Sequence, residues 1–290
     1  MIETGDLLFE KAGERELSQA IAGSTAGEEA FPYVHAGLLE REKDGLFLLH
    51  ASFKKGCLRE RLESFLEESH GDLDVYRVTK DHPFSKEDVL HRAEAMIGAP
   101  YNASFYPEGK GWYCATFIAS AFRDDSIFHM EPMAFGPKGS VLPFWKDYYE
   151  KLSLAVPEGL AGLSPNGMIR QGALRRMGTL RDALSSTKEG HAICGLLTDE
   201  EGRCSHYHTE RDVAALRCSR CGRYYACYQC HDLLEDHPFQ PASADDTAPV
   251  LCGSCFHTMT QEEYEKGHCP FCGHHFNPGC KKHHHMYFCH

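Results

Sequence analysis

The sequence lacks a long apolar run, an excess of basic residues and a leader-like start. Its longest apolar runs, such as residues 46–49, fall far short of the ~18 to 20 residues that a membrane span needs. The first ten residues contain neither a basic segment nor the apolar stretch of a secretory signal. The balance of 30 lysine and arginine residues against 42 acidic ones gives a net charge of −12. This charge disfavours nucleic-acid backbones and anionic lipid. We therefore expect a cytoplasmic protein with no membrane span and no nucleic-acid partner.

Cysteine and histidine are scarce in the first 190 residues and abundant in the last 100. Twelve of the 14 cysteines and 13 of the 19 histidines lie within residues 191–290. A chain of 290 residues also exceeds the usual single-domain size of ~100 to 200 residues. In a reducing compartment, closely spaced cysteines favour zinc thiolates over disulfides. The sequence predicts a domain with an ordinary core at 1–155, a linker at 156–190 and a metal-organised domain at 191–290.

The first domain reads as a mixed α+β fold. Short apolar runs bounded by turn residues, including the hairpin dipeptide Asp44-Gly45, predict strands at 5–9, 34–39, 46–51 and 73–78. Apolar residues at helical spacing predict helices over 57–66 and from Ser85, as the N-cap, to Ile97. Two further helices are predicted, a buried one that begins at Cys114 and one over 144–154.

Cys114 and two histidines form the candidate chemistry of this domain. The nucleophile in such sites is the thiolate, and a helix N-terminus lowers the pKa of a cysteine. His35 and His50 fall on two strands that a short connection would pair antiparallel, so one could act as base and the other orient it. The alternatives are that Cys114 is a small core residue and that the histidines are satisfied core or surface residues.

Five short motifs in this order resemble a known family. They are GDLLF at 5–9, HAGL at 35–38, LHA at 49–51, GAPYN at 98–102 and WYCATF at 112–117. Over about residues 1–150 the chain resembles the circularly permuted NlpC-type, papain-like cysteine hydrolases of the YiiX/YebB kind. The lecithin:retinol acyltransferase group shares the order His, His, Cys. An acidic, glycine-rich insertion around residues 23–30 departs from the family and could reshape access to the first histidine.

The resemblance implies a role for each matched residue. Cys114 would be the nucleophile, His35 the general base and His50 the polar third member, a position that is often a carboxylate in the permuted group. Tyr101 matches the aromatic residue beside the site and would line the substrate pocket. The substrate would be an amide or an ester, cleaved by way of a covalent thioester. A fold that is retained without catalysis is the alternative.

The last 100 residues carry four Cys-x₂-Cys pairs, at 218/221, 227/230, 252/255 and 269/272. Such pairs place two thiolates on one edge of a zinc tetrahedron. The last two pairs are separated by 13 residues, the spacing of a self-contained four-cysteine site, here Cys252, Cys255, Cys269 and Cys272. Eight further ligands predict two more zinc ions: Cys204, His206, Cys218, Cys221, Cys227, Cys230, His231 and His237. The spacing leaves their partition open. Cys280 and His283, extended by Cys289 and His290, could hold a fourth ion.

Residues 191–290 resemble the CHY-type zinc finger, from RCSHYH at 203–208 to MYF at 286–288. The resemblance implies zinc binding and a protein partner. Two functions of different classes follow for the whole chain. One is a cysteine hydrolase whose zinc domain recruits a substrate or partner. The other is a non-catalytic, zinc-dependent interaction or redox module on a retired hydrolase scaffold.

Overall fold

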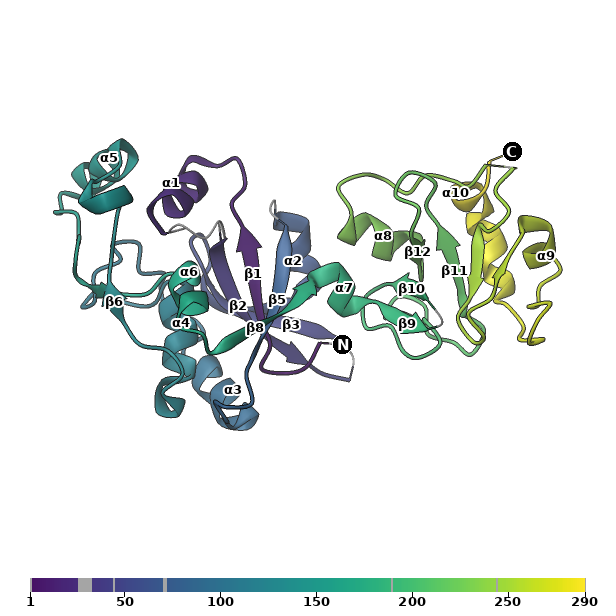
Figure 1. Ribbon diagram of the computed structural model, residues 1–290, viewed down its shortest axis with the longest axis horizontal. Coiled ribbons are helices and arrows are strands. Elements are labelled where there is room, and N and C mark those ends of the chain that lie inside the picture. Colours follow the sequence, from purple (N-terminus) through teal and green to yellow (C-terminus); the bar gives the residue numbers. More distant parts are fainter. Residues whose placement is uncertain are drawn as a thin grey trace. The chain divides into compact units, whose positions relative to one another are not determined.

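The computed structural model describes residues 2–25, 33–43, 45–69, 72–188, 190–243 and 245–289. The chain divides into two compact units, Ile2–Leu180 and Arg181–His290, and each is described by itself (Figure 1). Within the described ranges, no helix combines the length and the apolar character needed to cross a membrane. The expected hairpin residue Asp44 and most of the insertion around 23–30 lie outside those ranges.

The first unit is built on a six-stranded antiparallel sheet. Its strands are β1 Leu7–Lys11, β2 Tyr33–Arg41, β3 Leu46–Ser52, β4 Gly56–Arg61, β5 Leu73–Val78 and β8 Leu174–Thr179. They lie in the order β4-β3-β2-β1-β5-β8. The strands expected at 5–9, 34–39, 46–51 and 73–78 are all present, so the alternation of apolar runs and turns predicted them correctly.

Helices cover this sheet and extend beyond it. They are α1 Glu16–Thr25, α2 Leu62–Glu68, α3 Lys86–Glu94, α4 Cys114–Ala121, α5 Pro143–Leu152 and α6 Pro165–Arg170. Short 3₁₀ turns at Arg123–Asp125 and Pro137–Gly139 and a ribbon of β6 Glu131–Pro132 with β7 Ala161–Gly162 complete the unit. The core lies between α4, whose Phe117 and Ile118 are fully buried, and sheet residues such as Leu38 and Leu49.

Two parts of the first unit differ from the sequence expectation. The helix expected over 57–66 begins only at Leu62, because Gly56–Arg61 pairs with β3 as a strand. The helix from Ser85 is present but ends at Glu94 rather than Ile97. Ser85 is its N-cap, and its Oγ accepts the backbone N–H of Asp88 at 3.2 Å.

Residues 156–190 also differ from the expected linker. They contain β7, α6 and β8, and β8 forms the edge of the first sheet by pairing with β5. Two side-chain contacts hold this segment in place. Arg176 Nη2 donates to Asp74 Oδ1 at 2.8 Å, and Asn166 Nδ2 donates to the Tyr33 carbonyl at 2.9 Å. These contacts span about 100 residues or more of sequence, so no local apolar period reveals them.

The second unit has a sheet of very short strands, in the order β14-β13-β11-β12-β10-β9. They are β9 Ser186–Lys188, β10 His191–Cys194, β11 Ala214–Arg217, β12 Tyr224–Tyr225, β13 Val250–Cys252 and β14 Thr258–Met259. Its helices are α7 Leu180–Leu184 at the boundary, α8 Tyr228–Leu234, α9 Gln261–Glu265 and α10 His284–Tyr287, preceded by a 3₁₀ turn at Pro278–His283. Both this unit and the first mix helices and strands, which confirms the α+β class.

Candidate active site and metal centres

Cys114 is the first residue of α4, as the sequence predicted, and it is buried at 5% exposure. Two hydrogen bonds fix this helix start: Thr116 Oγ1 accepts the Tyr113 N–H at 3.1 Å and donates to the Tyr113 carbonyl at 3.0 Å. The backbone N–H groups of the first turn have no partner within a helix and point toward its start. The N–H groups of Ala36 and Ala115 both stabilise a negative charge on the Cys114 sulfur.

The electrostatics of this cysteine differ from the sequence expectation. Burial raises the pKa of Cys114 to about 11, and this effect outweighs the opposing backbone N–H groups of Ala36 and Ala115. The position at a helix start is therefore as expected, but it does not by itself produce a thiolate at neutral pH. At neutral pH the Cys114 side chain is therefore a thiol.

Three adjacent strands bring together two histidines and a carboxylate. His35 on β2 and His50 on β3 approach at 2.7 Å between Nε2 and Nδ1, and His50 Nε2 lies 2.9 Å from Glu60 Oε1 on β4. The register pairs Leu48 with Glu60 and His50 with Leu58, so His50 and Glu60 lie on the same face of the sheet. The result is a continuous hydrogen-bonded chain from a partly exposed carboxylate to a histidine next to α4.

The hydrogen-bond chemistry assigns the protons along this chain. The bond to His50 is the main cause that lowers the pKa of Glu60, with a contribution from Lys55, so Glu60 is ionised and can only accept. With both imidazoles neutral, His50 donates from Nε2 to Glu60 and accepts at Nδ1, and His35 donates from its own Nε2. Nδ1 of His35 then carries a lone pair. Burial, reinforced by His50, lowers the pKa of His35 well below its ordinary value, so the imidazole is neutral at rest.

The expected pairing of Cys114 with His35 is not made through a direct hydrogen bond. Within the described ranges, the polar contact of His35 is to His50, and the sulfur of Cys114 interacts with backbone N–H groups, including that of the adjacent Ala36. Helix α4 packs on β2, which carries His35. The structure therefore places Cys114 and His35 on neighbouring elements that pack together.

Glu60 is a site residue that sequence reasoning missed. Residues 59–61 fall within the helix expected over 57–66, an expectation that gives no reason to place Glu60 beside the histidines. The signal was available in principle, because a strand over these residues has period two and would place Leu58 and Glu60 on one face beside His50. The aromatic ring of Phe65, in the helix that follows, stacks on His35 with ring centroids 6.0 Å apart.

A cavity of about 200 Å³ opens beside Cys114. Tyr101, singled out from the sequence, lines this cavity together with Cys114 and Tyr113. Burial, with a smaller contribution from Cys114, raises the pKa of Tyr101 well above its ordinary value, so its hydroxyl stays protonated. Among the described residues, no hydrogen-bond acceptor faces that hydroxyl.

The second unit contains three clusters of four potential metal ligands, whose ligand atoms within each cluster lie within 4.8 Å of one another. The first cluster is Cys204, His206, Cys227 and Cys230. The second is Cys218, Cys221, His231 and His237, and the third is the expected set of Cys252, Cys255, Cys269 and Cys272. The first two clusters interleave along the chain, which resolves the partition that spacing alone left open. All twelve residues were expected ligands, and the number of clusters agrees with about three zinc ions.

The distances within the clusters fit zinc rather than disulfides. A tetrahedron with Zn–S bonds of about 2.3 Å has S···S edges of about 3.8 Å, whereas a disulfide needs about 2.05 Å. The sulfurs of Cys204 and Cys227 lie 3.7 Å apart, those of Cys252 and Cys272 3.8 Å, and those of Cys255 and Cys269 3.6 Å. These separations match the edges of a zinc tetrahedron, so the donor set fits zinc.

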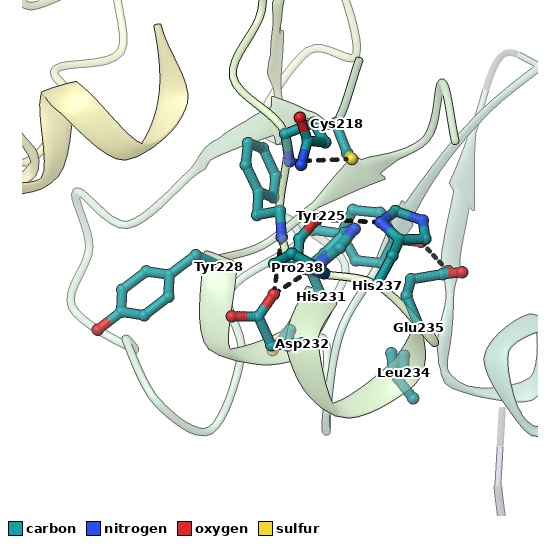
Figure 2. Close-up of polar contacts among 12 residues, drawn as sticks. Cys218, Tyr225, Tyr228, His231, Asp232, Leu234, Glu235, His237 and Pro238 are labelled. Atoms are coloured by element: carbon teal, nitrogen blue, oxygen red, sulfur yellow. Dashed lines mark hydrogen bonds and ion pairs between the residues drawn. The ribbon is translucent and has the colours of Figure 1, made fainter. Parts of the chain in front are cut away.

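Outer contacts orient the histidines of the second cluster (Figure 2). His231 Nδ1 lies 2.9 Å from Asp232 Oδ1, and His237 Nδ1 lies 3.0 Å from the Pro238 carbonyl. Both contacts hold Nδ1 as the protonated nitrogen and leave Nε2 for a metal, which is the usual arrangement of a zinc histidine. The Gln240 N–H donates to the sulfur of Cys218 at 3.4 Å, as expected for a thiolate ligand.

The expected fourth ion is not represented by a cluster among the described residues. His283 instead faces Tyr228, with ring centroids 5.5 Å apart, and Cys289 is exposed. The side chain of Cys280, and His290 as a whole, lie outside what the structure describes. A fourth zinc ion at Cys280 and His283 therefore stays a prediction.

Comparison with known proteins gives separate matches for the two parts of the chain. Residues 1–178 match a family model described as permuted papain-like amidase enzymes, YaeF/YiiX, C92 family. Residues 204–282 match the CHY zinc finger. The metalloprotein YiiX of Escherichia coli O157:H7 has a similar structure, with a TM-score of 0.50 and 19% identity over 61% of this chain and 97% of that one. This likeness shows a shared fold.

Two fungal proteins resemble about a third of the chain. An uncharacterized protein of Schizosaccharomyces pombe is 50% identical over 99 residues, which are 33% of this chain and 88% of that protein. Helper of Tim protein 13 of Saccharomyces cerevisiae is 43% identical over 104 residues, 33% of this chain and 90% of that protein. The matches with these relatives and with YiiX therefore cover most of each of those proteins.

Proposed function

Because the chain belongs to the permuted papain-like amidases of the YaeF/YiiX kind and carries a CHY zinc finger, we propose that it is a zinc-binding cysteine hydrolase of amides or esters. One observation supports this most directly. The chain from Glu60 through His50 to His35 leaves a neutral imidazole with a lone pair on the strand against which the helix of Cys114 packs. Assignment to the NlpC type and a cytoplasmic location are parts of the same proposal.

In the proposed first step, Cys114 is activated as the substrate reacts. His35 Nδ1 takes the thiol proton while Sγ forms a bond to the carbonyl carbon, because a thiol with a raised pKa needs a base at neutral pH. His50 accepts from His35 Nε2 and, through Glu60, stabilises the positive charge that His35 acquires. The scissile bond then breaks, and His35 returns the proton to the leaving nitrogen or oxygen.

The carbonyl oxygen becomes negative in this step and needs hydrogen-bond donors. The backbone N–H groups at the start of α4 supply one set. Tyr101 supplies another, since its hydroxyl stays protonated, faces no acceptor among the described residues and lines the cavity with Cys114. In the second step His35 draws a proton from water and the hydroxide attacks the thioester carbon. The C–S bond then breaks, and the protonated His35 returns its proton to the Cys114 sulfur. The products are a carboxylic acid and the free thiol.

The test is to trap the covalent intermediate. Zinc-loaded, reduced protein is mixed with p-nitrophenyl acetate, quenched in acid and digested, and the acetylated cysteine is located by mass spectrometry. We expect the acetyl group on Cys114 and its loss in Cys114→Ala. The His35→Ala variant should acylate about 100-fold more slowly or worse, the usual contribution of a positioned base.

Cys57 provides the matched control. It is the other cysteine of the first unit and is similarly buried, at 2% exposure, but it does not line the cavity. Cys57→Ala should therefore acylate as the wild type does. Acetylation spread over the zinc-binding cysteines, with Cys114 unmodified, would count against the hydrolase.

A second function is favoured by the fungal relatives that match about a third of the chain. One of them is named as a helper of another protein and spans little more than the shared region, since 90% of its length is matched. We propose that the CHY zinc finger of this chain likewise binds a protein partner. Zinc would supply structural stability, held by the three clusters. If Cys114 proves inert in correctly folded protein, this interaction role on a retired hydrolase scaffold becomes the better description of the whole chain.

A further inference from the structure

A separate cavity lies in the second unit, and its volume is about 220 Å³. Its floor is apolar and comes from β11 and the residue before α8, through Ala214, Leu216 and Ala226. Cys227, a residue of the first metal cluster, also lines it. A cavity of about 150 Å³ is known to hold benzene, so this one is large enough to hold the side chain of another protein.

Aromatic rings form the walls of this cavity. Tyr207, His283 and Tyr287 line it. The ring centroid of Tyr228 lies 5.5 Å from that of His283 and 6.4 Å from that of Tyr287, and the centroids of Tyr207 and His283 are 6.4 Å apart. Figure 2 shows that Tyr228 points away from the second metal cluster. Because a ring attracts a cation within about 6 Å of its centroid, a cation placed here would interact with several rings at once.

The charges beside the cavity are negative. Among the described residues that line it, Asp212 carries a carboxylate and none is a lysine or an arginine. The first metal cluster adds to this charge, since three thiolates and a neutral imidazole around one divalent ion leave a net charge of −1. A positively charged ligand is therefore favoured here, and an anionic one is repelled.

The hydrogen-bond acceptors of the lining are largely engaged within the unit. Asp212 Oδ2 accepts the backbone N–H of Thr209 at 2.8 Å and its hydroxyl at 2.6 Å. Asp212 Oδ1 accepts Asn277 Nδ2 at 2.7 Å, and Asn277 Oδ1 accepts the Gly279 N–H at 2.8 Å. An unmodified ammonium group would bring three N–H donors that need partners, and burying donors without partners costs free energy. A trimethylated ammonium keeps the charge and has no donor to satisfy.

From these observations we infer that this cavity binds the side chain of a trimethylated lysine of a partner protein. The aromatic rings surround the trimethylammonium group, and Asp212 and the first metal cluster balance its charge. The methylene stem of the lysine contacts the apolar floor. The inference rests on the proposed partner binding of the zinc finger, and it specifies the group that the partner presents.

The experiment measures the binding of small probes to the full, zinc-loaded chain by calorimetry. The probes are the N-acetyl methylamides of trimethyllysine, of unmodified lysine and of a neutral isostere in which a tert-butyl group replaces the trimethylammonium. We expect trimethyllysine to bind about tenfold more tightly than either of the others, because the isostere lacks the charge and unmodified lysine retains its donors. Choline has the same head group with two fewer methylenes, so it should bind roughly tenfold more weakly than trimethyllysine.

Variants of the wall and of the carboxylate locate the site. Tyr207→Leu removes one ring and should weaken trimethyllysine binding about fivefold, whereas Tyr207→Phe keeps the ring and should bind as the wild type does. Asp212→Asn should weaken binding of the cation and leave binding of the neutral isostere unchanged. Tyr224→Leu is the matched control, because Tyr224 is a partly exposed tyrosine of the same unit that does not line this cavity. Native mass spectrometry verifies that each variant keeps the zinc content of the wild type.

Photo-cross-linking of the full chain in cell extract separates this inference from the proposed partner binding. A zinc-dependent partner captured equally by the wild type and Tyr207→Leu, with no binding of trimethyllysine, would overturn the cavity assignment and leave the partner function standing. Trimethyllysine binding that depends on Tyr207, with no protein captured, would uphold the cavity as a trimethylammonium site and count against the partner function. Equal binding of trimethyllysine and its neutral isostere, or choline binding as tight as that of trimethyllysine, would overturn the assignment to a methylated lysine.

Discussion

The two units of this chain differ in what holds them together. In the first, the strands of the main sheet, five to nine residues long, pack on helices around a large apolar core, and a smaller aromatic cluster lies beside it. In the second, strands of two to four residues surround three clusters of cysteine and histidine, with smaller apolar clusters between them. Strands this short bury too little surface to be stable alone. The difference teaches that the second unit depends on metal ligands for the stability that its small buried apolar area does not supply. The first unit depends on its apolar core.

Metal removal should produce the largest difference in stability between the two units. Structural zinc contributes on the order of 10 kcal/mol per ion to small domains. We expect a strong chelator to unfold residues 181–290 while residues 2–180 keep their fold. Hydrogen exchange followed by mass spectrometry checks this, because amides of β11 and β13 should lose protection and those of β1 and β2 should not. Retained protection of β11 in verified zinc-free protein would show that its apolar cluster suffices.

A single ligand substitution should remove one ion from the second cluster. Cys221→Ser takes away one of four ligands there, and we expect native mass spectrometry to show two zinc ions in place of three. Cys194→Ser is the matched control, because Cys194 is a buried cysteine of the same unit that belongs to none of the described clusters. That variant should retain three ions. Loss of zinc from the control would mean that the ligand sets are assigned wrongly.

The pH dependence of Cys114 alkylation tests a cysteine of the first unit that belongs to none of the described metal-ligand clusters. Since burial raises the pKa of Cys114 to about 11, its thiolate fraction at neutral pH is about 100-fold below that of a cysteine of pKa ~9. Deprotonation increases with pH, so the rate of alkylation by iodoacetamide should rise about tenfold per pH unit from pH 7 up to about pH 10. Peptide mapping follows Cys114 alone. A rate that is already constant below pH 8 would indicate a preformed thiolate–imidazolium pair.

The smallest effect is expected at Glu60, which ends the hydrogen-bonded chain that runs from His35 through His50. Glu60→Gln keeps the shape of the side chain but removes the charge that holds His50 in its tautomer, and we expect kcat/KM to fall roughly tenfold. Glu68→Gln is the control, because Glu68 also pairs with Lys55, at 2.7 Å, but does not contact either histidine. Equal losses in both variants would assign the effect to Lys55 instead.

Sequence patterns predicted local features of both units well. The strands of the first sheet followed from apolar runs, and the start of α4 at Cys114 followed from the loop before it. In the second unit the Cys-x₂-Cys spacing identified eight of the twelve ligands of the three clusters, because the chemistry of zinc constrains short distances along the chain; the other four are Cys204, His206, His231 and His237.

Features that depend on distant partners were not predictable in the same way. β8 joins its sheet through β5, about 100 residues earlier, and appeared as a linker. The role of Glu60 was not predicted, because the apolar spacing of residues 57–66 fits a helix. Only the pairing of residues 56–61 with β3 makes them a strand. The division of eight ligands between two ions depends on how β12 and α8 fold back, since every Cys-x₂-Cys pair is chemically equivalent.

Helix α8 has a consequence for how the metal sites fill. Its consecutive residues Cys230 and His231 belong to different clusters, so a single peptide bond connects two coordination spheres. The rotation of α8 that completes one tetrahedron also aims the next side chain at the other ion. Occupancy of the first site thus pre-organises the second, and the two ions should enter cooperatively. At limiting metal, the population should divide into empty and doubly filled molecules, with few in between.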